Sequence, residues 1–170
     1  MSDHQIDPID QIESGKRRAI LAFVLNRSGV LNKISSLIRR KMYNVDTLTV
    51  CATKDPSISR MTLTLREGSD VKACQVVKQL EKMTEVISAK ELDINTSFWR
   101  EVGIIKFESD ETQIEMLKEK FSFELLDQQN NELFVVQIAG TSQYIDNFIA
   151  AVGKDKLFEA ARSGFTALER

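Results

Sequence analysis

Apolar and polar residues follow one another along this chain in blocks of strand and helix length. Residues 18–25 are almost continuously apolar, which is typical of a strand buried on both faces. After turn-forming residues at 26–29, apolar side chains recur at helical spacing between 30 and 38, with polar residues on the other face. These patterns predict a central strand followed by an amphipathic helix that packs on a sheet.

The next elements complete one domain. Residues 44–52 are rich in β-branched side chains, residues 54–57 are turn formers, and the strand expected at 59–65 alternates strictly. Its two faces carry Met61, Leu63 and Leu65 on one side and Arg60, Thr62 and Thr64 on the other. A second helix is expected after residues 67–70, and a further strand over 85–92. This βαββαβ order predicts a four-stranded antiparallel sheet with both helices on one face, the ferredoxin-like arrangement.

A similar order of elements starts again after a linker near residues 93–96. We expect strands at 99–107, 121–127, 133–139 and 157–168 and helices at 111–120 and 144–152; the first of these helices has a weak apolar stripe. The sequence therefore predicts an α+β protein of two ferredoxin-like domains in tandem. The expected organisation is a flexible N-terminal extension at 1–16, a first domain at 17–93 and a second domain at 97–170.

Composition excludes several classes of function. Lys and Arg number 23 against 25 Asp and Glu, so the formal charge of −2 gives no attraction to nucleic acid. The strand at 59–65 also lacks the aromatic residues on which RNA-binding ferredoxin-like domains stack bases. The longest apolar run, 19–25, is far shorter than the roughly 20 residues that cross a bilayer, and the acidic N-terminus does not resemble a secretion signal. We expect a cytoplasmic protein that binds neither nucleic acid nor membrane.

A catalytic site is difficult to assemble from these residues. The single histidine, His4, lies in the polar N-terminal segment, and Cys51 and Cys74 do not have the spacing of metal ligands. Acidic residues between 108 and 119 fall on a mostly polar helix, which is typical of a solvated face. We expect a non-catalytic chain without metal or cofactor, and cysteines that are small core or boundary residues. Trp99 is expected either to anchor a partner or to cover the seam between the domains.

The segment 26–31 joins a central strand to the N-terminus of a helix, where anions bind well. The backbone N–H groups of Gly29, Val30 and Leu31 have no partner within the helix, and the helix dipole favours a negative charge beside them. Gly29 also permits an unusual backbone angle and the close approach of a ligand. A carboxylate would fit at this position.

Two amide side chains could complete such a site. Those of Asn26 and of Asn44, at the start of the adjacent strand, could accept hydrogen bonds from an ammonium group. The alternative is a capped turn in which Ser28 or Asn26 is the N-cap and Gly29 serves only the backbone geometry. The spacing of these residues leaves both interpretations open.

A series of short motifs runs through both domains. In the first domain they are 25–31 (LNRSGVL), 43–45 (YNV), 48–50 (LTV) and 59–62 (SRMT). In the second domain they are 100–101 (RE), 104–106 (IIK), 137–141 (QIAGT) and 161–164 (ARSG). In this order and spacing the motifs resemble the regulatory (small) subunit of acetolactate synthase, also called acetohydroxyacid synthase. The likeness extends from Lys16 to the C-terminus.

The resemblance implies an N-terminal ACT domain, which is an amino-acid-binding module of ferredoxin-like fold, and a C-terminal ACT-like domain. Members of this family are not enzymes alone. They bind a separate catalytic (large) subunit that carries thiamine diphosphate, Mg²⁺ and FAD, raise its activity, and make it sensitive to feedback inhibition, typically by valine. The implied function is regulation of branched-chain amino-acid (valine, leucine and isoleucine) biosynthesis. The alternative is a stand-alone ACT amino-acid sensor that regulates another enzyme.

The resemblance also assigns roles to individual residues. Asn26, Gly29 and Asn44 match positions that contact the effector, and Val30 and Leu31 would contribute backbone N–H groups. The family's pocket lies where two ACT domains pair, which implies a homodimer.

Overall fold

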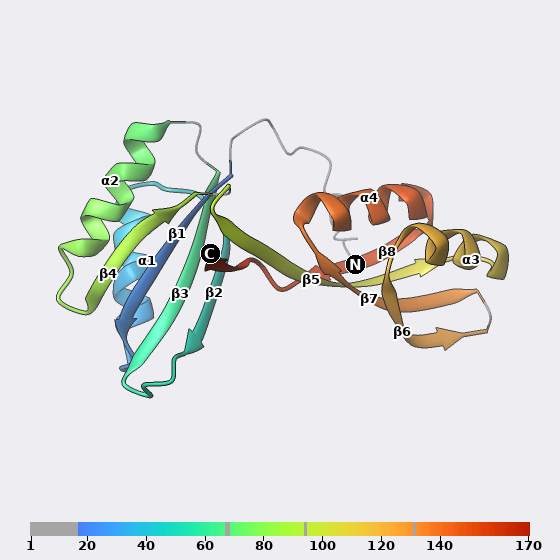
Figure 1. The fold of residues 1–170 in the computed structure, drawn as a ribbon, viewed down its shortest axis with the longest axis horizontal. Helices are drawn as coiled ribbons and strands as arrows, with labels where there is room; N and C mark the ends of the chain where they lie inside the picture. Colours follow the sequence, from blue (N-terminus) through green and yellow to red (C-terminus); the bar gives the residue numbers. More distant parts are fainter. Residues whose placement is uncertain (1–16, 67–68, 94, 131) are drawn as a thin grey trace, which may run out of the picture.

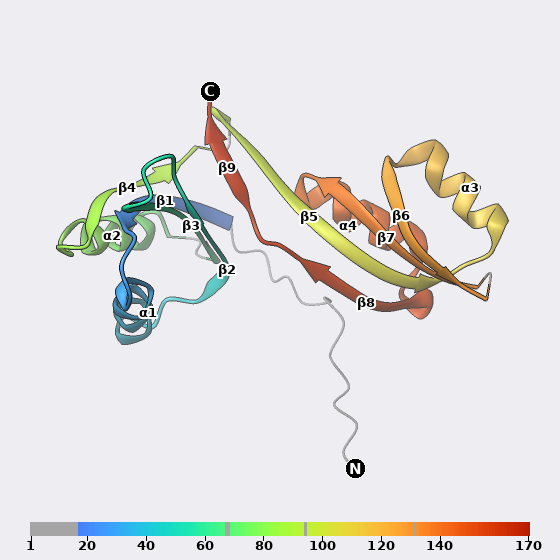
Figure 2. The same cartoon turned by 90° about the horizontal axis from the view of Figure 1, so that it is seen from below.

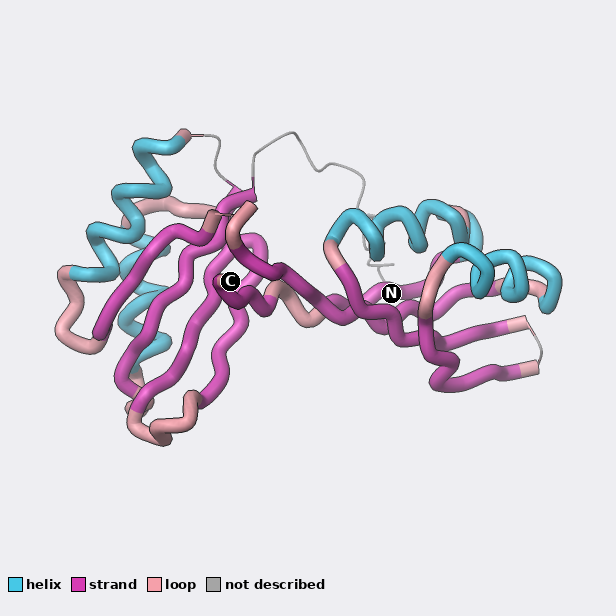
Figure 3. Tube along the Cα trace, in the orientation of Figure 1, coloured by secondary structure: helices cyan, strands magenta, loops and turns pink. Residues whose placement is uncertain are grey.

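The computed structural model describes residues 17–66, 69–93, 95–130 and 132–170. The predicted N-terminal extension, residues 1–16, lies outside these described residues. The described residues fold into two α+β domains, and in each of them two α-helices lie on one side of an antiparallel sheet (Figures 1 and 3). The tandem ferredoxin-like fold predicted from the order of elements is confirmed.

The first domain has the predicted βαββαβ order. Its strands lie in the order β2-β3-β1-β4, so that β1 is central and β2 is at an edge. Both helices turn their apolar stripes toward one face of this sheet, where they close the first core. The elements are β1 (Arg17–Leu25), α1 (Val30–Arg40), β2 (Val45–Ala52), β3 (Ile58–Arg66), α2 (Asp70–Glu81) and β4 (Val86–Leu92).

Strand β1 is buried on both faces, as its unbroken apolar run predicts. Ile20, Ala22 and Val24 pack in the core beneath the helices. Ala19 and Leu21 point the other way and belong to a separate apolar cluster shared with the second domain. Because β1 pairs with β3 and β4 along its length, its backbone groups are satisfied within the sheet.

The second domain repeats this plan with an additional short strand. Its main sheet has the order β6-β7-β5-β8, and β9 pairs separately with β5. The elements are β5 (Ser97–Glu108), α3 (Glu111–Lys120), β6 (Phe123–Gln129), β7 (Leu133–Gly140), α4 (Ser142–Val152), the 3-10 turn η1 (Lys154–Lys156), β8 (Leu157–Arg162) and β9 (Thr166–Glu169).

Aromatic side chains form the centre of the second core. Phe148 of α4 is fully buried and meets the rings of Phe107, Phe121 and Phe123 at centroid distances of 5.9, 5.4 and 5.3 Å. Helix α3 contributes only two buried side chains, which agrees with its weak apolar stripe. The second core therefore depends on α4 more than on α3.

The terminal strand region expected at 157–168 is divided into two strands, β8 and β9. β8 pairs with residues 103–107 of β5, whereas β9 pairs with residues 97–100. Between them the backbone turns at Gly164, where φ is +75°. β5 is long enough to extend from its own sheet to the first domain, and β9 follows it there (Figure 2).

The domains share a third apolar cluster, here called the seam. Ala19, Leu21 and Leu92 of the first domain meet Trp99, Phe165 and Ala167 of the second. The rings of Trp99 and Phe165 lie edge to face with centroids 5.7 Å apart. The expectation that Trp99 covers the seam is therefore confirmed. Thr62 and Thr64, which share the face of β3 opposite the helices, are buried as well.

Candidate functional site

The turn after β1 is fixed by backbone hydrogen bonds to the loops on both sides of it. Asn26 N–H donates to the carbonyl of Ser57 at 2.7 Å, and Leu25 N–H donates to the carbonyl of Glu85 at 2.8 Å. Ser57 and Glu85 directly precede β3 and β4, the two strands that flank β1. The turn is therefore fixed by the loops of both neighbouring strands, which suits a binding site.

Helix α1 begins at this turn without a side-chain cap. Gly29 is the N-cap residue with φ of +86°, and no side chain accepts a hydrogen bond from the first turn of the helix. The alternative in which Ser28 or Asn26 is the N-cap of this helix is therefore wrong. Val30 N–H donates to the Arg27 carbonyl at 3.3 Å, but within the described chain the N–H groups of Gly29 and Leu31 have no acceptor. Two of the three N–H groups predicted to be free are available to an anion.

The side chain of Asn26 is oriented by the β2–β3 turn. Its Nδ2 donates to the Pro56 carbonyl at 2.9 Å. This bond leaves Oδ1 as the acceptor that an ammonium group requires. In the same turn, hydrogen bonds from the Ser57 hydroxyl and backbone N–H hold the pKa of the Asp55 carboxyl below its ordinary value.

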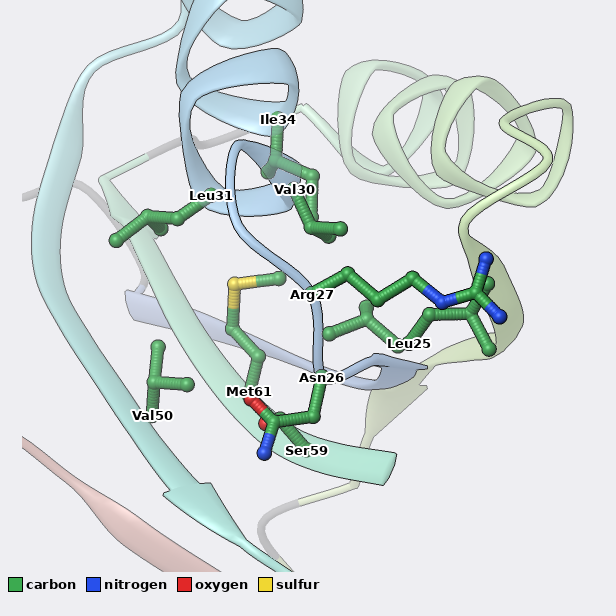
Figure 4. A pocket seen from close by; sticks show the side chains of 10 residues that line it. Leu25, Asn26, Arg27, Val30, Leu31, Ile34, Val50, Ser59 and Met61 are labelled. Carbon is green, nitrogen blue, oxygen red and sulfur yellow. The ribbon is translucent and has the colours of Figure 1, made fainter. Parts of the chain in front are cut away.

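A small apolar pocket adjoins these polar groups. Figure 4 shows Leu31 and Val50 on opposite sides of it, with Met61 between them and Asn26 close to Ser59. Leu31 and Val50 are 48% and 45% exposed, so the pocket opens toward the β2 edge of the sheet. The predicted site does not include Val50, Ser59 or Met61, which reach the turn only through the pairing of β3 with β1 and of β2 with β3.

Asn44 does not join this pocket within one chain. The prediction that it starts an adjacent strand is wrong, because β3 lies between β1 and β2. Asn44 directly precedes Val45, which pairs with Leu65 at the end of the sheet where β1 begins. Asn26 follows the other end of β1. The chain therefore brings Asn26, Gly29, Val30 and Leu31 together and places Asn44 at the opposite end of the sheet.

One ion pair joins α1 to the start of β4. Lys33 Nζ bonds to Glu85 Oε1, and this hydrogen bond holds the pKa of the Glu85 carboxyl below its ordinary value. The backbone carbonyl of Glu85 accepts from Leu25, so the same residue supports the turn through two different groups. The pair therefore helps to position the first turn of α1.

Metal-binding clusters and membrane-spanning helices are absent from the described ranges. These residues contain no group of three or more His, Cys, Asp or Glu side chains that could hold a metal ion. No described helix is both long and apolar enough to cross a membrane. Cys51 and Cys74 are both exposed, so the expectation of core or boundary cysteines is wrong.

Known proteins match this chain over both domains. A profile described as AHAS small subunit-like ACT domain matches residues 20–88, and one described as small subunit of acetolactate synthase matches residues 100–170. The small subunit of acetolactate synthase isozyme 3 from Escherichia coli is 33% identical over 91% of this chain and 96% of its own length. The acetolactate synthase small subunit from Bacillus subtilis is 32% identical over 91% of both chains.

A solved structure supports the same relationship. The crystal structure of the acetolactate synthase small subunit from Thermotoga maritima superposes with a TM-score of 0.81. The two sequences are 27% identical, and the match covers 91% of this chain and 98% of the other. The similarity therefore includes the fold of both domains.

Proposed function

This chain belongs to the acetolactate synthase small-subunit family, and from that premise we propose that it makes a catalytic subunit sensitive to a branched-chain amino acid. In this proposal the chain binds the catalytic (large) subunit, raises its activity, and transmits feedback inhibition by valine. Thiamine diphosphate, Mg²⁺ and FAD belong to the catalytic subunit. The chain itself binds the effector and the catalytic subunit and couples these two binding events, and it catalyses no step.

The observation that carries the proposal is the combination of polar and apolar groups at the turn between β1 and α1. The free N–H groups of Gly29 and Leu31 would receive the effector's carboxylate, aided by the positive end of the helix dipole. Oδ1 of Asn26 would accept from its ammonium group. A branched side chain would then lie against Val50 and Met61. These are the three parts that an aliphatic amino acid presents.

A homodimer would explain the position of Asn44. β2 is an edge strand, and its exposed apolar residues Leu48 and Val50 favour pairing with another chain. If β2 pairs antiparallel with β2 of a second copy, the start of one strand lies beside the end of the other. Asn44 of the second copy would then approach Asn26. We therefore propose a pocket completed by two copies, with Asn44 supplied across the dimer axis.

The test is to reconstitute the chain with its cognate catalytic subunit. We expect the chain alone to form no acetolactate from pyruvate, the mixture to turn over faster than the catalytic subunit alone, and valine to lower that rate. Calorimetric titration with valine, leucine and isoleucine would identify the effector. Acetolactate formation by the isolated chain, or failure to co-purify with the synthase, would contradict the proposal. Co-purification with a different enzyme would favour an amino-acid sensor of another pathway.

A further inference from the structure

Strands β2 and β3 have a different neighbour on each face. On one face, Val50 of β2 and Ser59 and Met61 of β3 line the effector pocket. On the other face, Thr49 and Arg60 contact the second domain. Because successive side chains in a strand point to opposite faces, each contact residue lies next to a pocket residue along the backbone.

The second domain makes these contacts through residues 163–167, here called the strap, which connect β8 to the start of β9. The Ser163 carbonyl accepts a hydrogen bond from Thr49 Oγ1 at 3.5 Å, and the Ala167 carbonyl accepts one from Arg60 Nη2. Gly164 passes so close to β2 that an ideal Cβ would lie 3.0 Å from the Cβ of Thr47. Figure 2 shows β9 beside the face of the first sheet that the helices leave uncovered.

The strap is also firmly joined to its own domain. Ser163 N–H donates to the Val102 carbonyl at 2.9 Å, and Val102 N–H donates to Ser163 Oγ at 3.0 Å. Directly before it, Arg162 forms ion pairs with Glu101 of β5 at 3.2 Å and Asp146 of α4 at 2.8 Å. A displacement of the strap would therefore be passed to β5 and α4.

We propose that the strap is the route by which effector binding in the first domain is transmitted to the second. This inference rests on the proposed function. An effector that contacts Val50 and Met61 alters the preferred position of β2 and β3, and a close-packed contact on their other face must then change as well. The coupling arises because the strap makes different contacts in the free and bound states.

Trp99 provides a direct measurement of this coupling. It is the only tryptophan in the chain, it is 8% exposed, and it stacks edge to face on Phe165 of the strap. We expect valine to change the emission of Trp99 in the full chain, with the same midpoint as the calorimetric binding curve. Unchanged emission at calorimetric saturation would overturn the proposal. Absence of any heat of binding would instead contradict the proposed function, and the strap proposal would fall with it.

Gly164→Ala tests the strap in the complex with the catalytic subunit. The new Cβ meets Thr47 and Thr49 at 3.0 and 3.1 Å, so the strap must move away from β2. Gly153→Ala is the matched control, because Gly153 has a comparable φ of +96° but its Cβ would meet nothing within 4 Å. We expect Gly164→Ala to raise the valine concentration for half-inhibition about tenfold while the affinity of the chain for valine changes by less than about twofold. The control should retain the wild-type curve.

A second variant covers the possibility that Gly164→Ala does not fold. Arg60→Met removes the hydrogen bond to Ala167 without adding volume at the strap. We expect a shift of half-inhibition in the same direction and a weaker response of Trp99 to valine. If a folded Arg60→Met chain shows the wild-type inhibition curve and the wild-type emission change, the strap does not carry the signal.

Discussion

Gly29 is the residue on which the proposed effector site depends most directly. Its φ of +86° lies in the left-handed region, and an ideal Cβ there would meet no atom within 4 Å. Glycine is therefore favoured by the backbone angle and not by a lack of space. A side chain at this position would extend into the open region at the N-terminus of α1, where the proposal places a carboxylate.

We expect Gly29→Asp to abolish inhibition by valine while activation remains. Strain at a left-handed aspartate costs about 1 kcal/mol, and a negative charge at the helix N-terminus offsets about 0.3–1 kcal/mol of this. Two carboxylates about 4 Å apart at an effective dielectric near 20 repel by about 4 kcal/mol, so valine affinity should fall by more than about a hundredfold. The measurement is synthase activity against valine concentration.

Gly29→Ala separates charge from backbone strain in this experiment. Alanine has the same left-handed strain and no carboxylate, so inhibition should be weakened much less than in Gly29→Asp. An unchanged inhibition curve for Gly29→Asp would remove the turn from the effector site. Loss of both activation and inhibition would show that Gly29 is required for the fold alone.

Residue types predicted this turn well because asparagine, serine and glycine act through local backbone geometry. The cap of α1 could not be predicted in the same way, because Ser28 has a suitable side chain and the observed turn does not use it. The position of Asn44 depends on which strand lies between β1 and β2, and the exposure of Cys51 depends on β2 being an edge strand. Neither the strand order nor the edge position of β2 can be inferred from the residue types of Asn44 and Cys51.

The prediction of helices and strands also succeeded where the local sequence decides the structure and failed where distant contacts decide it. The periodicity of apolar residues predicted the helices and strands because these residues recur on the buried side of each element. It could not divide β8 from β9, because that break depends on their shared partner strand, β5, which extends from its own sheet to the first domain. Thr62 and Thr64 occupy the predicted second face of β3, but they are buried, which the local alternation does not reveal.

The two helices of the second domain should differ in their contribution to stability. Phe148 of α4 is fully buried among three aromatic rings, so Phe148→Ala should lower the free energy of unfolding by about 3–5 kcal/mol. Met116 of α3 is 51% exposed, and Met116→Ala should change the free energy of unfolding by less than about 0.5 kcal/mol. Urea unfolding of the full chains measures both. Similar losses in the two variants would contradict the assignment of Phe148 to the core and of Met116 to the surface.

The ion pair between α1 and the start of β4 should make stability depend on pH. Lys33 lowers the pKa of Glu85 in the folded chain, so ionised Glu85 stabilises the fold above its ordinary pKa of about 4.5. That contribution is lost as pH falls through the lower folded pKa. The difference in melting temperature between wild type and Glu85→Gln should therefore be present at neutral pH and vanish in acid.

Lys33→Met is the control for this pH dependence. Without the ammonium group, the effect of Glu85→Gln should depend much less on pH, because the largest cause of the lowered pKa is gone and only a backbone hydrogen bond still lowers it. A pH-dependent difference that is undiminished in the Lys33→Met background would assign the effect to the backbone hydrogen bond of Glu85 and not to Lys33. High salt should also reduce the difference in melting temperature between wild type and Glu85→Gln, since the ion pair is partly exposed.

The seam makes the first domain depend on the second for covering the apolar residues of its sheet. The pocket residues all lie between positions 24 and 61, so a fragment of residues 1–92 should still bind valine. The fragment lacks β5 and β9, and it therefore exposes Ala19, Leu21 and Phe23 on the uncovered face of the sheet. We expect it to bind a hydrophobic dye, to self-associate, and to activate the synthase incompletely. Full activation with full feedback inhibition would show that the second domain is dispensable.

Leu21→Thr distinguishes loss of the seam from loss of the domain's other functions. In the full chain Leu21 is 4% exposed within the seam, so threonine there leaves a cavity and buries a hydroxyl, at about 1–3 kcal/mol of stability. In the fragment the same position faces water, where threonine suits a strand and removes apolar surface. The substitution should therefore destabilise the full chain in urea but reduce dye binding and self-association of the fragment. Equal destabilisation of both proteins would mean that the first sheet buries this face without the second domain.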